Sequence, residues 1–222
     1  MDRRNFISGV GYGLLSLSLA GCGFKLPGSG AAGNSPDAAA QGKNSSPDTK
    51  AEIGSQTQMN GGNNKLLIAY FSKTGNTREI ANQIHANVGG EMFEIKTADP
   101  YPADYNATVD QAKKELENSY RPNLTAKVQN MAAYDVTFLG YPNWWGTIPM
   151  ALFTFLEGYN FSGKTIIPFC THEGSRLGRS VNDLRQLCPQ TTLLDGLAIR
   201  GSSVKSAQND VVTWLRQIGM IK

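Results

Sequence analysis

One short segment gathers hydrogen-bonding groups that could bind an anion. Ser72, Thr74, Asn76 and Thr77 offer side-chain donors within six residues, and Gly75 lets the backbone N–H groups turn toward one point. A helical pattern follows at once, and the N-terminus of a helix carries unpaired N–H groups and a partial positive charge. This hydroxyl loop, residues 72–77, is therefore suited to a phosphate group. The alternative is an ordinary helix cap built from turn residues.

The residue order of the hydroxyl loop excludes two common nucleotide-binding loops. Lys73, Thr74 and Gly75 follow one another without the spaced glycine of GxxxxGK[ST], and the loop has no GxGxxG pattern. Polar side chains stand where those loops have glycine. This favours a terminal phosphomonoester over a buried pyrophosphate.

A second segment, YPNWWGTIP at residues 141–149, places two adjacent tryptophans between prolines. Exposed indoles are unfavourable without a binding role, and neighbouring side chains do not readily both point into the core. Gly146 lets the backbone of this tryptophan turn, residues 144–147, approach a flat ligand or change a peptide orientation. The alternative is that both rings close the end of the sheet. A phosphate loop beside an aromatic wall describes a site for a planar ring that carries a phosphate.

The remaining reactive side chains form no recognisable catalytic group. A returning helix separates Cys170 from Cys188 by roughly 18 Å, whereas a disulfide needs Cα atoms less than about 7 Å apart. We therefore expect two buried thiols. Glu157, Asp183 and Asp195 are scattered and predict neither a metal site nor an acid–base pair.

The two loops lie within an alternation of strands and helices. Strands that are apolar throughout and separated by helices predict a parallel sheet covered on both faces. Ligands of such sheets bind outside the carboxyl ends of the strands, where the hydroxyl loop and the tryptophan turn are expected. The predicted strands are 65–71, 91–97, 135–142, 164–172 and 191–201, and the predicted helices are 77–90, 104–120, 149–159, 178–189 and 206–221.

The first 22 residues have the pattern of an export signal. Arg3 and Arg4 precede a short apolar stretch at 6–20, which is diluted by glycine and serine and ends in small residues. The sequence RRNFI resembles a twin-arginine signal. LAGC resembles a bacterial lipobox, in which Cys22 is lipidated and becomes the first mature residue. The alternatives are an ordinary secretory signal and a chance match at the cysteine.

Residues 23–64 are rich in Gly, Ser, Asn, Ala, Pro, Gln and Asp, with scarcely an aliphatic side chain. Such a segment buries too little apolar surface to offset its loss of conformational entropy, so we expect a disordered tether. Its reach would be on the order of 35–40 Å. The folded domain is predicted at 65–222. Lipid on Cys22 would hold it at the periplasmic or extracellular face of a bacterial membrane.

The segment FSKTGNT resembles the T/S-x-T-G-N-T phosphate loop of flavodoxins, and the resemblance extends from Lys65 to Lys222 through the Trp-Gly turn. It implies a flavodoxin-like α/β fold, which is a doubly wound five-stranded parallel sheet in the order 2-1-3-4-5 with helices on both faces. It also implies FMN, with the isoalloxazine against Trp145 and the peptide after Gly146 opposite its N5. The residues implied to contact FMN are Ser72, Lys73, Thr74, Gly75, Asn76, Thr77, Pro142, Asn143, Trp144, Trp145, Gly146, Thr171, His172, Glu173, Gly174 and Ser175.

Two features depart from the flavodoxin pattern. Many flavodoxins carry a second aromatic residue in the loop after the fourth strand, where this chain has His172 and Glu173. Typical flavodoxins are strongly acidic, whereas residues 65–222 contain 16 Lys and Arg against 14 Asp and Glu. For His172 we expect a neutral imidazole that hydrogen-bonds the ring or a loop carbonyl, with a proton-donor role as the alternative. His85 is expected on a helix surface.

The resemblance implies an FMN-binding electron-transfer protein with no catalytic residue of its own. Its partner would be a redox protein or a small quinone or nicotinamide donor. The alternatives are an FMN-dependent NAD(P)H or quinone oxidoreductase and a non-redox anion-binding module with a degenerate flavin site. The basic residues are scattered among acidic ones, which argues against a nucleic-acid partner, and we expect a monomer. Because FMN is made in the cytoplasm, a route that exports folded proteins would allow loading before export.

Overall fold

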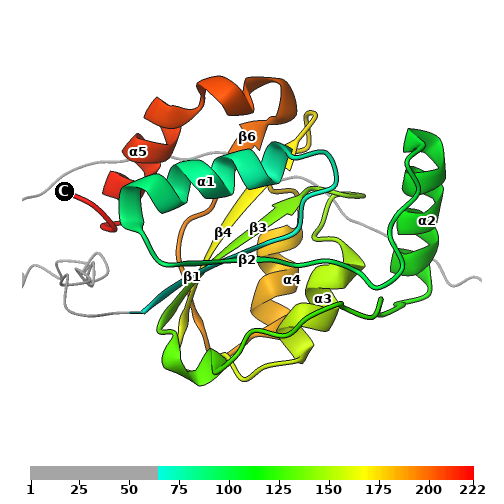
Figure 1. Cartoon of the computed structure of the whole chain (residues 1–222), viewed down its shortest axis with the longest axis horizontal. Coiled ribbons are helices and arrows are strands. Elements are labelled where there is room, and N and C mark those ends of the chain that lie inside the picture. Colours follow the sequence, from blue (N-terminus) through cyan, green and yellow to red (C-terminus); the bar gives the residue numbers. More distant parts are fainter. Residues whose placement is uncertain (1–64) are drawn as a thin grey trace, which may run out of the picture. The chain divides into compact units, whose positions relative to one another are not determined.

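The computed structural model describes residues 65–222. The predicted export signal, Cys22 and the predicted tether at 23–64 lie outside these residues. Within 65–222 a single twisted sheet has helices on both of its faces (Figure 1). None of the helices in this range is both long enough and apolar enough to span a bilayer.

The sheet has the predicted parallel order β2-β1-β3-β4-β5. Leu67 of β1 pairs with Glu91 of β2 on one side and with Thr137 of β3 on the other, and Val136 pairs with Thr165 of β4. The doubly wound fold class predicted from the strand and helix alternation is therefore confirmed. The strands are β1 (Leu66–Tyr70), β2 (Glu91–Glu94), β3 (Val136–Pro142), β4 (Thr165–His172), β5 (Thr192–Leu193) and β6 (Leu197–Arg200).

Alternate side chains of the strands enter two separate hydrophobic cores. Leu67 of β1 faces the core that is closed by α3 (Met150–Glu157) and α4 (Ser180–Leu187). Ile68 faces the core that is closed by α1 (Asn76–Val88) and α5 (Gln208–Gln217), and Figure 1 shows these two pairs of helices on opposite sides of the sheet. Both faces are therefore covered, as the apolar strands require.

The helix α2 (Tyr105–Glu117) covers neither core. It lies beside α3 at one end of the molecule, at the right of Figure 1. Asp104 caps its first turn, because the carboxylate accepts a hydrogen bond of 2.8 Å from the N–H of Ala107. More than half of its residues are exposed.

The predicted fifth strand at 191–201 is interrupted, and this part of the prediction was wrong. Both β5 and β6 pair with β4, but residues 194–196 lie between them. The N–H groups of Thr192 and Leu194 donate to the carbonyls of Lys164 and Ile166, so Pro168 is the next residue of β4 to face β5. Proline has no N–H to continue the ladder, and the strand breaks there.

Two short 3₁₀ helices complete the described part of the chain, at Met131–Ala133 and Gly201–Ser206. The second replaces the start of the predicted last helix, so α5 begins at Gln208 instead of residue 206. Pro149 caps α3 with an extended backbone and is not its first helical residue.

Candidate functional site at the carboxyl end of the sheet

Three loops meet at the carboxyl ends of β1, β3 and β4. The N–H of Asn143, just after β3, donates to the carbonyl of Thr171 near the end of β4, at 2.8 Å. The hydroxyl of Thr77, in the first turn of α1, is 2.9 Å from that of Thr171. The fold thus brings the hydroxyl loop, the tryptophan turn and the loop after β4 together, as the strand order predicted.

The hydroxyl loop turns directly into α1. Gly75 precedes this helix with a φ of +92°, in the left-handed region that favours glycine. The first helical hydrogen bond runs from the N–H of Glu79 to the carbonyl of Gly75, so the N–H groups of Asn76 and Thr77 precede the helical ladder. Ser72 Oγ accepts from the N–H of Arg78 at 3.2 Å, which leaves its own proton available to an anion.

The side chains of the hydroxyl loop differ in exposure. Thr77 is buried and hydrogen-bonded to the buried Thr171, so its hydroxyl is held in one position. Lys73 is half-buried and Thr74 is exposed. The loop therefore combines one fixed hydroxyl with neighbouring groups that are accessible to a ligand.

The tryptophan turn is a type I′ turn. Trp144 and Thr147 exchange two backbone hydrogen bonds of 3.0 Å, and the two central residues, Trp145 and Gly146, have φ values of +52° and +80°. A positive φ is unfavourable for tryptophan, so the surrounding contacts must hold the turn in place.

The two tryptophans point in different directions. The ring of Trp144 is partly buried and makes edge contacts with Phe71 and Tyr101, at centroid distances of 5.4 and 4.9 Å. Trp145 is 47% exposed. The two rings therefore do not both turn into the core, as the sequence predicted.

The helix α4 holds the other side of the turn. The carbonyl of Gly146 accepts a hydrogen bond of 2.8 Å from the N–H of Arg179. Thr147 Oγ1 donates to the carboxylate of Asp183, and Arg179 Nε lies 3.1 Å from the same carboxylate. A Cβ on Gly178 would lie 2.3 Å from the Gly146 oxygen, so only glycine fits there.

The loop after β4 contributes one buried imidazole nitrogen to the site. His172 Nδ1 is buried and has no hydrogen-bond partner among the described residues. Burial lowers the pKa of His172 below its usual value, and the charge of Arg176 acts in the same direction. The imidazole is therefore neutral near pH 7, as predicted, although the expected hydrogen bond to a loop carbonyl is not formed at Nδ1.

A second polar atom in the site is also buried and unpaired within the described part of the chain. Asn143 Nδ2 donates to the carbonyl of Arg176 at 2.7 Å, whereas Asn143 Oδ1 has no partner. Buried polar atoms are usually hydrogen-bonded, so Asn143 Oδ1 is a candidate acceptor for a donor group of a ligand.

The carboxylate of Glu173 lies near the hydroxyl loop. Both Glu173 and Asn76 of the hydroxyl loop lie against Gly201. A Cβ added to Gly201 would be 2.4 Å from Glu173 Oε1 and 2.8 Å from Asn76 Nδ2. Arg200 Nε is 4.0 Å from Glu173 Oε2. Gly174 and Ser175 continue the loop and are exposed, and Pro142 ends β3.

Sequence reasoning missed the residues that hold the tryptophan turn. Asp183 of α4, which was predicted to form neither a metal site nor an acid–base pair, bonds the turn, as does Arg179 just before α4. Lys113 of α2 lies over the Trp145 ring. Each is an ordinary helix surface residue in its local sequence. No local signal identifies them, because their partners are about 35 residues away in the chain.

The two cysteines of the domain are buried free thiols, as predicted. Burial raises the pKa of Cys170 to about 12 and raises that of Cys188. Within residues 65–222 no three His, Cys, Asp or Glu side chains are grouped as a metal site would require.

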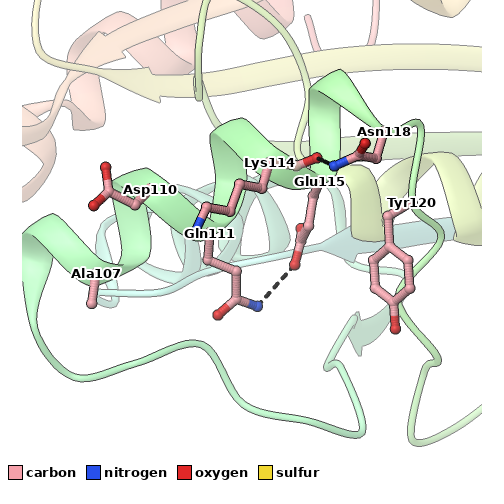
Figure 2. A pocket seen from close by; sticks show the side chains of 7 residues that line it. All are labelled: Ala107, Asp110, Gln111, Lys114, Glu115, Asn118 and Tyr120. Carbon is pink, nitrogen blue, oxygen red and sulfur yellow. Dashed lines mark hydrogen bonds between the residues drawn. The ribbon is translucent and has the colours of Figure 1, made fainter. Parts of the chain in front are cut away.

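A separate hollow of about 620 Å³ lies along α2, between its side chains and Tyr120 (Figure 2). Its polar side chains bond mainly along the helix, as in the hydrogen bond of 2.8 Å from Gln111 Nε2 to Glu115 Oε1. No residue of the three loops contributes to it. The lining residues are Ala107, Asp110, Gln111, Lys114, Glu115, Asn118 and Tyr120.

Comparison with known proteins agrees with this geometry. Residues 65–218 match the family model described as flavodoxin, which covers more than half of the chain. The chain belongs to the flavodoxin family. No curated protein matches it.

Solved structures of other flavoproteins resemble this flavodoxin-family domain. A protein assigned as a flavoprotein from Bacteroides eggerthii is 35% identical, with a TM-score of 0.63 over 70% of this chain and 98% of the other. A second protein assigned as a flavoprotein, from Bacteroides uniformis, is 32% identical, with a TM-score of 0.62 over 69% of this chain and 98% of the other. The flavoprotein from Lactobacillus acidophilus, solved in complex with FMN, is 23% identical and shows the same fold, with a TM-score of 0.51 over 64% and 97%.

Proposed function

We propose that this protein binds FMN at the carboxyl end of its sheet and transfers electrons. The observation that carries the proposal is the junction of the hydroxyl loop with the tryptophan turn in a member of the flavodoxin family. FMN is the cofactor that both the family and a structural relative support. When bound, FMN supplies one- and two-electron transfer.

The hydroxyl loop fits a phosphate group. The N–H groups of Asn76 and Thr77 and the positive end of α1 are at the loop, and Ser72 retains a hydroxyl proton. At Gly75 an added Cβ would meet nothing within 4 Å, so the space beside this backbone is open. These groups would bind the phosphate monoester, with Lys73 and Thr74 at its solvent side.

The other two loops fit the ring end of the cofactor. Asn143 Oδ1 and His172 Nδ1 are buried and unpaired within the described residues, so a ligand placed between these loops would find hydrogen-bond partners. Trp144 and Trp145 would form the aromatic wall. Thr171, Glu173, Gly174 and Ser175 are proposed to border the pyrimidine end.

The hydrogen bond between Arg179 and Gly146 affects how this chain contacts the ring. It occupies the carbonyl that the flavodoxin resemblance would turn toward N5. Turning that peptide toward a ligand breaks one internal hydrogen bond, at a net cost of about 0.5–1.5 kcal/mol. Rotation of this peptide therefore costs more free energy here than in a turn whose carbonyl makes no internal hydrogen bond.

We propose an electron carrier rather than a reductase, because the outermost part of the aromatic wall is open to a protein partner. Trp145 is 47% exposed, and the net charge of the domain is not the strong negative charge of typical flavodoxins. The partner would accordingly not require a cationic surface. It would be a redox protein, with a small quinone or nicotinamide donor as the alternative.

Stepwise reduction of the purified, FMN-loaded protein tests the carrier role. A carrier should show two resolved one-electron steps in its visible spectrum and should oxidise NADPH negligibly without a partner protein. Prompt oxidation of NADPH or a quinol by the protein alone would instead support the oxidoreductase. Protein that stays colourless with excess FMN would support the non-redox anion-binding module.

We further propose that the protein is exported and held at a bacterial membrane through lipid on Cys22. The support is the sequence RRNFI followed by LAGC at the end of the predicted signal. Replacement of Cys22 by Ala should release the protein from the membrane fraction. Replacement of Arg3 and Arg4 by Lys should block export if the signal is of the twin-arginine type, whereas unchanged export would indicate the ordinary secretory route.

A further inference from the structure

Both tryptophans of the site contact the same peripheral element, the helix α2. None of its residues belongs to either hydrophobic core. Its contacts with the aromatic wall are made by polar and charged side chains as well as by apolar ones.

The first contact fixes Trp145. Its indole Nε1–H donates to the carbonyl of Val109 at 3.1 Å, and Lys113 Nζ lies 5.4 Å from the ring centroid. An ammonium group over an indole face is attracted by the ring. Trp145 has an unfavourable φ of +52°, and these two contacts offset the cost of that conformation.

The second contact reaches Trp144 through Tyr101. The rings of Tyr101 and Trp144 meet edge to face at 4.9 Å. The Tyr101 hydroxyl donates to Glu115 Oε2 at 2.5 Å, and Gln111 Nε2 donates to Glu115 Oε1 at 2.8 Å. Glu115 is 6% exposed, so its carboxylate is a buried and fully engaged anchor.

The surface of α2 between these two contacts packs on the turn itself. Ala112 and Leu116 line a narrow seam together with Trp144, Trp145 and Thr147. On a helix, residues four apart lie in rows, so the Gln111–Glu115, Ala112–Leu116 and Val109–Lys113 rows are neighbours. The Ala112–Leu116 row therefore faces the aromatic wall. It is flanked on one side by the Val109–Lys113 row and on the other by the Gln111–Glu115 row, which Figure 2 shows.

We infer that α2 positions the aromatic wall, with Lys113 and Glu115 as positioning residues for Trp145 and Trp144. Neither side chain needs to touch the cofactor. Lys113 holds the exposed indole in one orientation, and Glu115 holds Tyr101, which packs on the edge of the inner indole. The consequence for FMN rests on the proposed function, whereas the consequence for the two indoles does not.

The first test replaces Lys113 by Gln and uses Lys114→Gln as the matched control, since Lys114 is exposed on the same helix and does not contact Trp145. In the apoprotein, acrylamide quenching of tryptophan fluorescence should increase for Lys113→Gln only. FMN affinity, measured by calorimetry, should fall about 2- to 5-fold. Lys113→Arg keeps a cation that can stack on the ring and should restore both values.

The second test replaces Tyr101 by Phe, which keeps the ring but removes the hydroxyl that Glu115 holds. Tyr120→Phe is the control, because the Tyr120 hydroxyl is exposed and makes no hydrogen bond within the described residues. Tyr101→Phe should alter the near-UV circular dichroism of the apoprotein and weaken FMN binding on the order of 3- to 10-fold. Tyr120→Phe should change neither.

The two sets of measurements separate this inference from the proposed function. If each variant behaves like its control in quenching, circular dichroism and FMN affinity, then α2 does not position the wall and the inference is wrong. If wild-type protein fails to bind FMN but the apoprotein signals change as expected, the positioning role stands and the proposed cofactor is wrong.

Discussion

The hydroxyl loop and the tryptophan turn lie side by side but are held by different kinds of contact. Within the loop, Ser72 bonds the N–H of Arg78 and Gly75 bonds that of Glu79, so these contacts span six residues or fewer. The turn is held by Arg179 from α4 and by Val109 from α2, each more than 30 residues away. One tertiary contact also reaches the loop, the hydroxyl pair of Thr77 and Thr171, which are 94 residues apart. The backbone of the phosphate end is therefore held by local contacts, whereas the ring end is held by tertiary contacts.

This difference predicts where substitutions act. A change within the hydroxyl loop should alter binding of the phosphate directly. A change in α2 or α4 should alter binding of the ring without any contact to it, because these helices set the orientation of the turn.

Gly178→Ala should disrupt the packing behind the tryptophan turn. The new Cβ would lie 2.3 Å from the Gly146 carbonyl oxygen, and Gly178 has a φ of +55°. We expect the free energy of unfolding to fall by about 2–4 kcal/mol, measured by urea denaturation. Gly75→Ala is the matched change in the hydroxyl loop. Gly75 also has a positive φ, but an added Cβ would have no neighbour within 4 Å. This substitution should therefore lower the free energy of unfolding by only about 1 kcal/mol. Equal costs would contradict the contrast.

Thr77→Val should act on the phosphate end. It keeps the shape of a buried side chain but removes the hydroxyl that is bonded to Thr171. We expect the dissociation constant for FMN to rise about 10-fold or more, measured by calorimetry. Thr137→Val is the control, because the Thr137 hydroxyl is buried in β3 without a partner among residues 65–222. It should be neutral or stabilising and should leave FMN affinity unchanged. A similar loss in both variants would argue against a phosphate role for Thr77.

Trp145→Ala should weaken FMN binding by about 2- to 10-fold and should shift the reduction potentials. Because this side chain is 47% exposed, thermal stability should change little. Trp144→Ala removes a partly buried ring that contacts Phe71 and Tyr101, so it should lower stability as well as affinity. Unchanged affinity and potentials in Trp145→Ala would refute its place in the wall.

His172 should make stability depend on pH. Burial lowers its folded-state pKa below the usual value near 6.5, so the unfolded chain binds this proton first as the pH falls. The free energy of unfolding should therefore decrease as the pH is lowered through 6.5 and below, while Arg176 and Arg200 oppose protonation and Glu173 favours it. His172→Asn should reduce this pH dependence, and the exposed His85→Asn should not. An identical pH profile in both variants would assign the dependence to other groups.

Much of this structure could be predicted from local patterns. The alternation of apolar strands and helices was sufficient for the doubly wound fold class, whereas the strand order was implied by the flavodoxin resemblance. The hydroxyl loop lies where its sequence placed it. The absence of a bridge between Cys170 and Cys188 followed from the helix that separates them. These features depend on residues that are close in sequence.

Other features depend on pairing partners that the sequence does not reveal. The break between β5 and β6 requires knowing that Pro168 faces the neighbouring strand, and not only that it lies in a strand. The contacts of Lys113 and Asp183 with the tryptophan turn require the positions of α2 and α4. A charged residue on a helix surface has the same local pattern whether or not it meets such a partner.

Calorimetric titration of the full chain with FMN, and separately with riboflavin, measures what each end of the site contributes to binding. Riboflavin presents the ring without the phosphate, so the comparison separates the hydroxyl loop from the tryptophan turn. We expect one FMN per chain and an affinity at least about 100-fold higher than that for riboflavin, because charge-assisted hydrogen bonds to the phosphate are lost. Equal affinities for the two ligands, or no binding of FMN, would contradict the account.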